Sequence, residues 1–399
     1  MLEGKKIVVG VTGGIAAYKA VELVSHLRAA RAAVKVVLTR AAQEFIQPLT
    51  LRVVAENEVY TGLFGGAEVL PHIRLALEND LLVIYPATAN FIGQAAWGLA
   101  PDLLSTLLLA FQGPVVICPA MNVRMYTNAA VRENLRRLQE RGYIVVPPET
   151  GRLACGDVGT GRLPPPAVVA EVIQGALVPK DLTGLTLLVT AGPTREPLDP
   201  VRYITNRSSG KMGYAVARAA RDRGARVVLI SGPTALPEPP GISLIRVNTA
   251  LAMREEVWKH FDAADVVVMC AAVSDYRPKQ VSPEKMKKGP PEITVEFVQN
   301  PDILAELGER KRRQLLVGFA AETGNVLAYA RAKLEAKNLD LVVANDVRQE
   351  GAGFEADTNL VWLVFRDGRF LELPRMDKYQ VAHRLLDAIL GIWKGGYRE

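Results

Sequence analysis

Long apolar runs alternate with amphipathic stretches along the chain, and the alternation starts afresh in mid-chain. Uninterrupted apolar runs are typical of parallel strands covered on both faces, whereas apolar positions three and four apart predict helices. In the first half the pattern predicts strands at residues 6–11, 34–39, 81–85 and 115–118, and helices at 16–31, 101–110 and 129–141. In the second half it predicts strands at 185–189, 226–230, 243–247, 265–270, 293–297, 315–319 and 339–344, a β-rich segment at 358–373, and helices at 214–223, 250–261, 300–313, 326–337 and 378–390. We therefore expect two α/β units.

The boundary between the units is predicted within residues 163–184. This segment has three consecutive prolines, one short helical pattern and a further proline before the next strand. Proline-rich segments of this kind act as stiff spacers between domains. We place the boundary near Lys180, which gives domains at residues 1–180 and 181–399.

Length and composition are those of an ordinary globular chain. Its 399 residues, 49% apolar and 23% charged, favour two or three domains. No apolar run reaches the roughly 18 residues of a membrane span, and the first residues lead directly into a strand without a signal sequence. We expect a cytoplasmic protein that binds no membrane.

The cysteine content and the charge limit the ligands. Three cysteines outside any metal-binding spacing exclude a disulfide framework, and a net charge of +6 spread along the chain fits anionic small ligands better than nucleic acid.

Polar residues follow the predicted strands of the first half, where ligands of open α/β sheets bind. Gly13 and Gly14 follow the first strand, but the chain lacks the G-x-G-x-x-G pattern of dinucleotide sites and has Thr39 where their acidic residue belongs. This departure favours a mononucleotide phosphate or a flavin over NAD. A tight turn without a ligand explains the stretch about equally well.

Three other residues of the first half are candidates for chemistry. Asn122 follows the fourth strand, and its amide can bind a substrate carboxylate. His72, which we expect to precede a short helix beginning near residue 73, is the one ready acid or base near this edge, although a lone histidine is more often structural. Cys155 lies in a glycine-rich and therefore mobile stretch, which makes it a candidate for a reactive thiol or a proton donor. Cys118 and Cys270 lie in apolar strands and are expected in the core.

Two polar loops of the second half predict an anionic ligand. The loop at 190–213 combines residues that allow close backbone approach with cations ahead of a helix, which suits a phosphate. These residues are Gly192, Ser208, Ser209, Gly210 and Gly213, with Arg195, Arg202, Arg207 and Lys211. The loop after residue 270 holds the carboxylate of Asp275 near Arg277, Lys279, Lys285, Lys287 and Lys288. One carboxylate for a metal and several cations for a polyphosphate favour a nucleoside triphosphate, with a solvated basic loop as the alternative.

Two further features of the second half have structural explanations. Asn300 is a good helix cap and Pro301 a good first helical residue. Lys333 and Lys337, four residues apart, share one helix face, and solvent is the usual neighbour of such a pair.

The motifs GVTGGIAAYK, PATAN, PAMN and ACGD, with the His72 segment, stand in the order and spacing of the flavin-dependent cysteine decarboxylases, and the first half resembles phosphopantothenoylcysteine decarboxylase in particular. The resemblance implies a flavodoxin-like or Rossmann-like sheet that binds FMN at a subunit interface of a trimer. It implies that His72 is catalytic, that Asn122 contacts the substrate carboxylate and that Cys155 donates a proton. The implied FMN-binding residues are Gly13, Gly14, Ile15, Ala16, Thr39, Thr88, Asn90 and Ser105.

The motifs AGPTREPLDPVRYITNRSSGKMG, AAVSDYR, KMKK, NPDI, GFAAET and KNLDLVVAND resemble the phosphopantothenate–cysteine ligase domain. The resemblance implies a Rossmann-like sheet on which CTP and Mg²⁺ activate a carboxylate as an acyl-cytidylate for attack by cysteine. It implies that Lys285 serves formation of this intermediate and that Asn206, Arg202 and Ala272 serve its conversion. The implied nucleotide-binding residues are Gly192, Ser208, Gly210, Asp275, Lys285, Asn300, Pro301, Asp302, Ile303, Phe319, Lys333 and Lys337, with Asp275 also holding the metal.

The order of the two halves is that of the bacterial bifunctional flavoproteins of coenzyme A biosynthesis. The resemblance implies small-molecule substrates and a dodecamer built from decarboxylase trimers and ligase dimers. The resemblance also implies that FMN oxidises the thiol-bearing carbon, that CO₂ is then lost, and that reduced FMN returns the hydride while Cys155 protonates the resulting enethiolate, with no net redox change. A regulatory flavoprotein with a decayed site would require the loss of His72, Asn122 or Cys155, and all three are present. A Rossmann oxidoreductase is the other alternative, and the missing dinucleotide pattern weighs against it.

Overall fold

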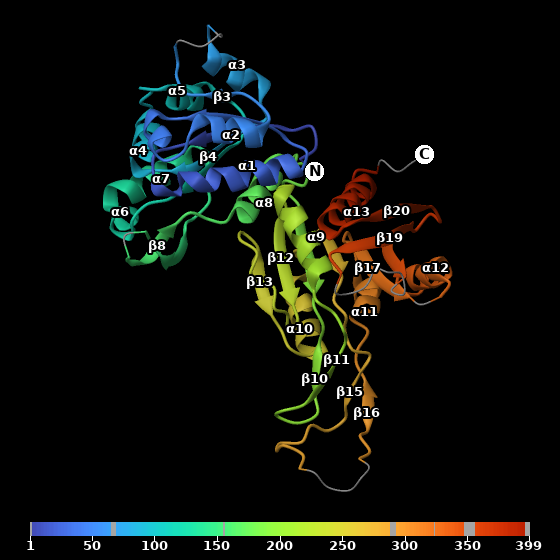
Figure 1. Ribbon diagram of the computed structural model, residues 1–399. Coiled ribbons are helices and arrows are strands. Elements are labelled where there is room, and N and C mark those ends of the chain that lie inside the picture. Colours follow the sequence, from blue (N-terminus) through green and yellow to red (C-terminus); the bar gives the residue numbers. More distant parts are fainter. Residues whose placement is uncertain are drawn as a thin grey trace. The chain divides into compact units, whose positions relative to one another are not determined.

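The computed structural model describes residues 2–64, 69–154, 156–287, 293–322, 324–346 and 356–395. The chain forms two compact units, Met1–Val178 and Pro179–Glu399, each built around its own sheet (Figure 1). Among the described residues, no helix has the combination of length and apolarity that crossing a bilayer requires.

The first unit has a parallel sheet in the order β3-β2-β1-β4-β5-β6. Its strands are β1 (Lys6–Val11), β2 (Ala33–Leu38), β3 (Val59–Tyr60), β4 (Leu81–Ala87), β5 (Val115–Pro119) and β6 (Ile144–Val145). This is the Rossmann order, in which the direction of winding reverses between β1 and β4. The carboxyl ends of these two strands therefore open a crevice between their following loops.

Helices cover both faces of this sheet. One face packs on α1 (Ala20–Ala29), α2 (Pro48–Ala55) and α8 (Pro166–Ala176), and the other on α3 (Pro71–Glu78), α4 (Ala89–Trp97), α5 (Leu103–Ala110) and α7 (Ala129–Glu140). The short elements are η1 (Ile15–Lys19), η2 (Arg40–Glu44), α6 (Val123–Thr127) and the hairpin of β7 (Glu149–Arg152) and β8 (Val158–Arg162). Because a core lies on each face of the sheet, successive residues of a strand are apolar: Ile7 and Val9 of β1 face one core and Val8 faces the other.

Three predictions for the first unit are wrong in detail. The helix predicted at 16–31 is divided into η1 and α1. His72 lies inside α3, which begins at Pro71, and does not precede the helix. The segment predicted as a stiff spacer contains α8, whose Val169 and Ile173 are fully buried in the first core.

The second unit repeats the same winding and then extends it. Its sheet has the order β13-β12-β9-β14-β17-β18-β19-β20, in which β19 pairs antiparallel with both β18 and β20. The strands are β9 (Thr186–Ala191), β12 (Arg226–Ser231), β13 (Ser243–Arg246), β14 (Val266–Met269), β17 (Leu315–Glu322), β18 (Leu341–Asp346), β19 (Thr358–Phe365) and β20 (Phe370–Asp377). Read in chain order, the six parallel strands follow the same Rossmann order as the first sheet, with its reversal between β9 and β14.

Helices cover both faces of this second sheet. α9 (Lys211–Asp222) and α13 (Lys378–Trp393) pack on one face, and α10 (Ala250–Phe261), α11 (Ile303–Arg310) and α12 (Val326–Ala336) on the other. The prediction of two α/β units with Rossmann-like sheets is thus confirmed.

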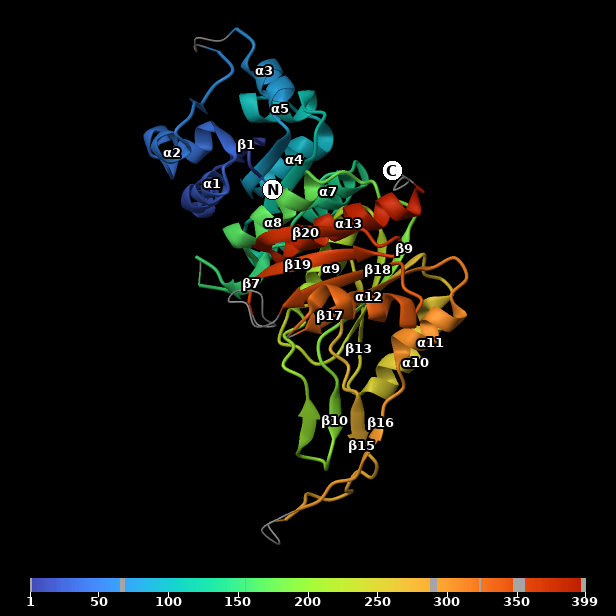
Figure 2. The same ribbon diagram turned by 90° about the vertical axis from the view of Figure 1, so that its right-hand side faces the viewer.

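Two short ribbons project from the second unit, beside each other in both views (Figures 1 and 2). One pairs β10 (Arg195–Pro197) with β11 (Tyr203–Thr205), and the other pairs β15 (Tyr276–Pro278) with β16 (Phe297–Gln299). The strand predicted at 293–297 is wrong, because β16 begins at Phe297 and belongs to a ribbon and not to the main sheet. We call these two ribbons and the loops at their ends the arm.

Candidate active sites

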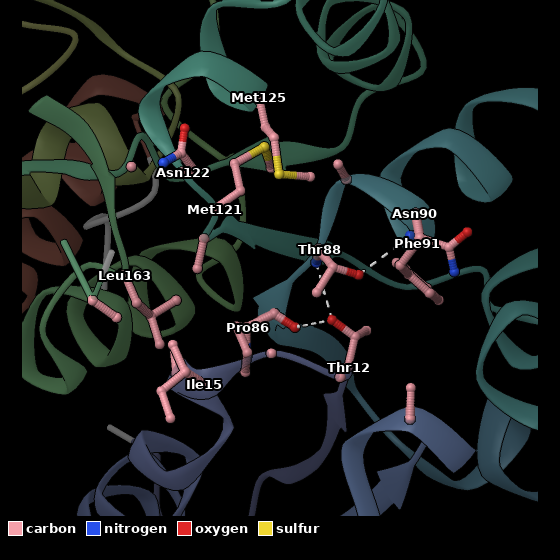
Figure 3. Close-up of a pocket in the computed structure, with 18 of the residues that line it drawn as sticks. Thr12, Ile15, Pro86, Thr88, Asn90, Phe91, Met121, Asn122, Met125 and Leu163 are labelled. Atoms are coloured by element: carbon pink, nitrogen blue, oxygen red, sulfur yellow. Dashed lines mark hydrogen bonds between the residues drawn. The ribbon is translucent and has the colours of Figure 1, made fainter. Parts of the chain in front are cut away.

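The crevice between β1 and β4 holds a cavity of about 1280 Å³ in the first unit (Figure 3). Thr12, which is buried, closes its base by joining the two strand ends. Its Oγ1 donates to the carbonyl oxygen of Pro86 at 2.8 Å and accepts from the backbone N–H of Thr88 at 3.0 Å. This pair of bonds fixes the loops after β1 and β4 beside each other.

Most of the predicted cofactor residues line this cavity. They are Gly13, Gly14, Ile15, Ala16, Thr39, Thr88 and Asn90. Thr39 and Thr88 cap η2 and α4, because their Oγ1 atoms accept from the N–H groups of Ala42 and Phe91. Ser105 is not among the lining residues. It is buried and forms a capping box with Asp102 at the start of α5.

Sequence reasoning missed part of the lining. The charged lining residues are the basic Lys19, Arg40, Arg152 and Arg162 and the acidic Glu44 and Asp102, so cations outnumber anions. Phe91, Met121 and Met125 add apolar surface, and Figure 3 shows the two methionine side chains beside Asn122. Thioether and aromatic groups adapt well to a flat ring. The basic residues were recognisable from sequence as charges at strand ends and in the glycine-rich hairpin.

Asn122 connects the cavity to the β7–β8 hairpin. Its Oδ1 accepts from the N–H of Arg124 at 2.8 Å, which caps α6, and its Nδ2 donates to Oδ2 of Asp157 at 3.1 Å. The hairpin lies close to this loop, since the N–H of Met121 donates to the carbonyl oxygen of Gly161 at 3.1 Å. Cys155, which comes between β7 and β8 in the sequence, lies outside the described residues.

The residues on either side of Cys155 form a more regular structure than the sequence predicts. Glycines were expected to make the stretch mobile, but residues 149–152 and 158–162 pair as antiparallel strands. The glycines permit close packing, because a Cβ at Gly161 would lie 2.1 Å from the carbonyl oxygen of Met121 and one at Gly159 would lie 2.8 Å from Val123.

His72 is not among the cavity-lining residues in the described part of the chain. It is half-buried in α3, and its Nδ1 has no hydrogen-bond partner among the described residues. The structure therefore does not bring His72 together with Asn122 in one cavity.

Cys118 and Cys270 carry free thiols. Cys118 is buried in β5 and Cys270 is half-buried after β14. Burial raises the pKa of both thiols, that of Cys270 to about 12. A thiol with a raised pKa is a poor nucleophile, so neither is suited to chemistry.

In the second unit, predicted residues meet at the reversal between β9 and β14. The N–H of Ala272 donates to the carbonyl oxygen of Gly192 at 2.9 Å, and Nδ2 of Asn206 donates to the carbonyl oxygen of Ala272 at 3.1 Å. The side chain of Asn206 thus ties the end of the β10–β11 ribbon to the loop after β14. Three residues that were predicted separately lie together here.

A smaller cavity of about 60 Å³ lies at the start of α9. Ser208, Gly210 and Phe319, all predicted to bind nucleotide, are among its lining residues, with Lys211 and the buried Lys378. Gly210 caps α9 with a φ of 77°, and a Cβ there would lie 2.7 Å from the side chain of Thr234. The backbone at this helix start therefore requires glycine.

Lys333 and Lys337 each contact another predicted nucleotide residue. Nζ of Lys333 donates to the carbonyl oxygen of Phe319 at 2.6 Å, and Nζ of Lys337 lies 2.7 Å from Oδ2 of Asp302. Burial alone would raise the pKa of Asp302, but the hydrogen bonds from Lys337 and from the N–H of Ala305, with the charges of Lys337 and Lys333, together outweigh it, and the pKa lies below its usual value. The two lysines do not simply face solvent.

The start of α11 differs from the prediction. Asp302, and not Asn300, caps this helix, which begins at Ile303, so Pro301 precedes it. The side chain of Asn300 is used elsewhere: its Nδ2 donates to the carbonyl oxygen of Ser274 at 2.8 Å. Ile303 itself is buried in the core.

Asp275 is next to this point and exposed. Its carbonyl oxygen accepts from the N–H of Asn300 at 2.7 Å, which leaves the carboxylate at the surface of the arm. Among the described residues, no group of three or more histidine, cysteine, aspartate or glutamate side chains gathers around it or elsewhere as a metal cage. A single carboxylate suits Mg²⁺ that is bound mainly through phosphate oxygens.

Arg202 and Lys285 lie near each other on the arm. Arg202 pairs with Asp199 through Nε and Oδ2 at 3.0 Å, and its Nη2 donates to the carbonyl oxygen of Met286. Lys285, one residue before Met286, is exposed. Arg202, predicted to serve conversion of the acyl-cytidylate, thus binds the backbone of the residue that follows Lys285, which is predicted to serve formation of that intermediate.

Comparison with known proteins gives the same two-part division. Residues 1–178 match the flavoprotein family, and residues 182–392 match the DNA/pantothenate metabolism flavoprotein C-terminal domain. The chain is 48% identical to the coenzyme A biosynthesis bifunctional protein CoaBC of Bacillus subtilis over 99% of this chain and 98% of the relative. It is 47% identical to CoaBC of Escherichia coli over 98% and 97% of the two chains. The solved C-terminal domain of a CoaBC protein covers 54% of this chain and 99% of that domain, at 44% identity and a TM-score of 0.48.

A flavoprotein domain followed by a pantothenate-metabolism domain defines a class of two-domain α/β flavoproteins. The chain belongs to the family of coenzyme A biosynthesis bifunctional proteins, CoaBC, which unite a phosphopantothenoylcysteine decarboxylase with a phosphopantothenate–cysteine ligase. The predicted family and its pairing of two activities are confirmed.

Proposed function

We propose that this chain makes 4'-phosphopantetheine from 4'-phosphopantothenate and cysteine in two steps, with CTP and Mg²⁺ in the second unit and FMN in the first. The proposal depends above all on the cavity between β1 and β4. Seven of the eight predicted FMN contacts line it, and its other charged residues are mostly cations. We also expect the enzyme in the cytoplasm, where small-molecule substrates are its partners.

The residues of the first cavity fit FMN. A volume of about 1280 Å³ exceeds the roughly 300–1,000 Å³ of most small-molecule sites, so the cavity is large enough for FMN. The backbone from Gly13 to Ala16 and the hydroxyls of Thr39 and Thr88 offer donors for a phosphate at the winding reversal, and Met121 and Met125 offer apolar contacts to a flat ring. FMN, when bound, supplies the reversible oxidation of substrate that makes loss of CO₂ from a cysteine possible.

We assign Asn122 to the binding of the substrate carboxylate. Its Nδ2 already donates to one carboxylate, that of Asp157 on the hairpin, and a substrate carboxylate requires the same donor. We assign Cys155 as the proton donor to the enethiolate by the resemblance of its ACGD motif. His72 is assigned to the cavity of a neighbouring copy, as expected for a site completed between subunits of a trimer.

In the second unit the carboxylate of phosphopantothenate attacks the α-phosphate of CTP, which gives an acyl-cytidylate and releases pyrophosphate. The amine of cysteine then attacks the acyl carbon, which forms the amide and releases CMP. Lys285 neutralises charge on the triphosphate, and Asp275 would hold an Mg²⁺ ion that would supply further positive charge there. Asn206, with Ala272 and Arg202, holds the acyl group for the second step. Dimers of this unit and trimers of the first would combine into a dodecamer.

The decisive test is product analysis of the purified full chain by mass spectrometry. Phosphopantothenate, cysteine, CTP and Mg²⁺ should yield phosphopantetheine, CO₂, CMP and pyrophosphate from a protein with the absorbance spectrum of bound flavin. Reactions without CTP, or with ATP in its place, control for nucleotide use. Colourless protein that stops at phosphopantothenoylcysteine would contradict the FMN assignment but keep the ligase, and absence of CMP would contradict the CTP assignment.

A further inference from the structure

Asp199, at the tip of the β10–β11 ribbon, carries a carboxylate that is completely inaccessible to solvent. Four donors surround it. Oδ1 accepts from the N–H groups of Val201 and Arg202 at 2.7 Å each, and Oδ2 accepts from Nε of Arg202 at 3.0 Å and from the N–H of Met286 at 3.2 Å. A buried carboxylate in a thin arm, far from a deep core, is retained only where all its acceptor sites are used.

The donors come from two separate loops of the arm. Val201 and Arg202 belong to the turn that contains Asp199, whereas Met286 belongs to the loop after β15. Arg202 also donates to the carbonyl oxygen of Met286. The Asp199–Arg202 pair therefore holds both the N–H and the carbonyl group of the Met286 backbone. A third bond joins the loops, from the N–H of Ser282 to the carbonyl oxygen of Leu198 at 3.0 Å.

Lys285 lies between these two attachment points. Ser282 is fixed before it and Met286 directly after it, while the Lys285 side chain itself is exposed. The bonds therefore fix the backbone of this short segment and leave the ammonium group accessible to a bound triphosphate. A long, flexible side chain acts more effectively when its backbone is held in place.

We propose that Asp199 is a positioning residue of the ligase: together with Arg202 it holds the Met286 backbone and so presents Lys285 to the triphosphate. This inference rests on the proposed function and deepens it. It also gives Arg202 a second role, because removal of its guanidinium would release the segment that carries Lys285.

The electrostatics agree with this geometry. Burial alone would raise the pKa of Asp199, but the N–H donors of Val201, Arg202 and Met286 and the charge of Arg202 outweigh it and lower the pKa. The group is therefore a carboxylate at neutral pH, and replacement by an amide of the same shape changes its charge and one acceptor only.

The test measures acyl-cytidylate formation by the full-length enzyme, followed as pyrophosphate release without cysteine. Asp199→Asn should lower kcat and kcat/KM for CTP together, by about 10²-fold. The reason is that Lys285 would no longer be held in place, and its contact with the triphosphate acts in the transition state. Lys285→Gln gives the reference loss. If Asp199 acts through Lys285, the double variant should be no slower than Lys285→Gln alone, because the two effects are then not additive.

Asp367→Asn is the matched control, since Asp367 also pairs with an arginine in a tight turn, that between β19 and β20, outside both sites. Hydrogen exchange of the peptide spanning 282–287 should speed up in Asp199→Asn and stay unchanged in Asp367→Asn. Urea unfolding of the second unit, which should occur at the wild-type denaturant concentration, confirms that each variant is folded.

Three results would overturn the inference: wild-type kinetics in Asp199→Asn, losses that multiply in the double variant, or unchanged exchange at 282–287. These are distinct from failure of the proposed function, in which the wild-type enzyme itself would release no pyrophosphate from CTP.

Discussion

Single buried side chains determine how the second unit responds to pH, and His383 on α13 is the clearest case. Its ring packs edge-on against Tyr379 at 4.5 Å between centroids, and its Nε2 has no hydrogen-bond partner among the described residues. Burial lowers the pKa of His383 below its ordinary 6.5, and Arg223 lowers it further, against the smaller opposite effects of Asp222, Asp387 and Asp181. The folded unit therefore holds this histidine neutral.

This predicts a loss of stability in acid. Since the pKa of His383 is lower in the folded than in the unfolded chain, its contribution is complete above about pH 6.5 and is lost as pH falls from there through the folded pKa. Urea unfolding of the second unit between pH 7.5 and 5 should show a decline that is weaker in His383→Gln. His260→Gln, on α10, controls for the loss of a histidine elsewhere in the unit. Equal slopes in all three proteins would contradict the prediction.

At the residue scale, much of the first site could be predicted and some of it could not. Glycines and threonines at strand ends were recognisable because β1 and β4 are long apolar runs with sharp ends. The FMN contact of Ser105 stays a prediction: the residue does not line the cavity, and its capping box with Asp102, three residues earlier, was recognisable from the sequence. The role of Asp199 depends on Met286, 87 residues away, and no local pattern reveals that contact.

At the scale of elements, α8 shows why a proline-rich segment is not always a spacer. Val169 is fully buried against the first core, whereas its neighbour Val168 is 45% exposed. Val169→Ala removes two buried methyl groups and should destabilise the first unit by about 2 kcal/mol, while Val168→Ala should change stability by less than about 0.5 kcal/mol. Denaturant unfolding of both variants compares them directly. Equal stabilities would mean that α8 does not belong to this core.

The β7–β8 hairpin gives a second element-scale prediction. Gly161→Ala would place a Cβ 2.1 Å from the carbonyl oxygen of Met121, so the hairpin must move away from the loop that holds Asn122. Decarboxylation of supplied phosphopantothenoylcysteine should fall at least about tenfold, given the sensitivity of catalysis to such displacements. Ligation should be unaffected.

Gly151→Ala is the matched control on the other strand of the hairpin. A Cβ there would lie 3.6 Å from the Arg162 side chain, an ordinary contact, so this variant should decarboxylate normally. Equal activity of the Gly161→Ala and Gly151→Ala variants would show that close packing of the hairpin is unimportant for the reaction.

Helices and strands could be predicted where neighbouring residues in the sequence determine them, and not where distant contacts do. The buried strands and long helices follow from apolar periodicity and were placed within a few residues, and α10 within its true bounds. The arm was not predicted, because β10, β11, β15 and β16 are three residues long and are stabilised by each other and not by a core. The cap of α11 was wrong because the amide of Asn300 bonds to Ser274, a contact distant in sequence.

At the scale of the whole molecule, the chain contains the same parallel strand order twice, and each sheet has its candidate site at its own reversal point. Each unit has two separate cores, one on each face of its sheet. Because the described polar contacts of each site lie within one unit, damage to one site should leave the chemistry of the other intact.

This independence predicts that two inactive enzymes complement each other. Asn122→Ala should accumulate phosphopantothenoylcysteine, because the ligase works and the carboxylate donor of the decarboxylase is missing. Lys285→Gln should form little of this intermediate but decarboxylate it when it is supplied. A mixture of the two variants should convert phosphopantothenate to phosphopantetheine, since the intermediate passes through solution from one protein to the other. Mass spectrometry of the mixture checks this, and a mixture that still accumulates the intermediate would show instead that the two reactions are coupled within one assembly.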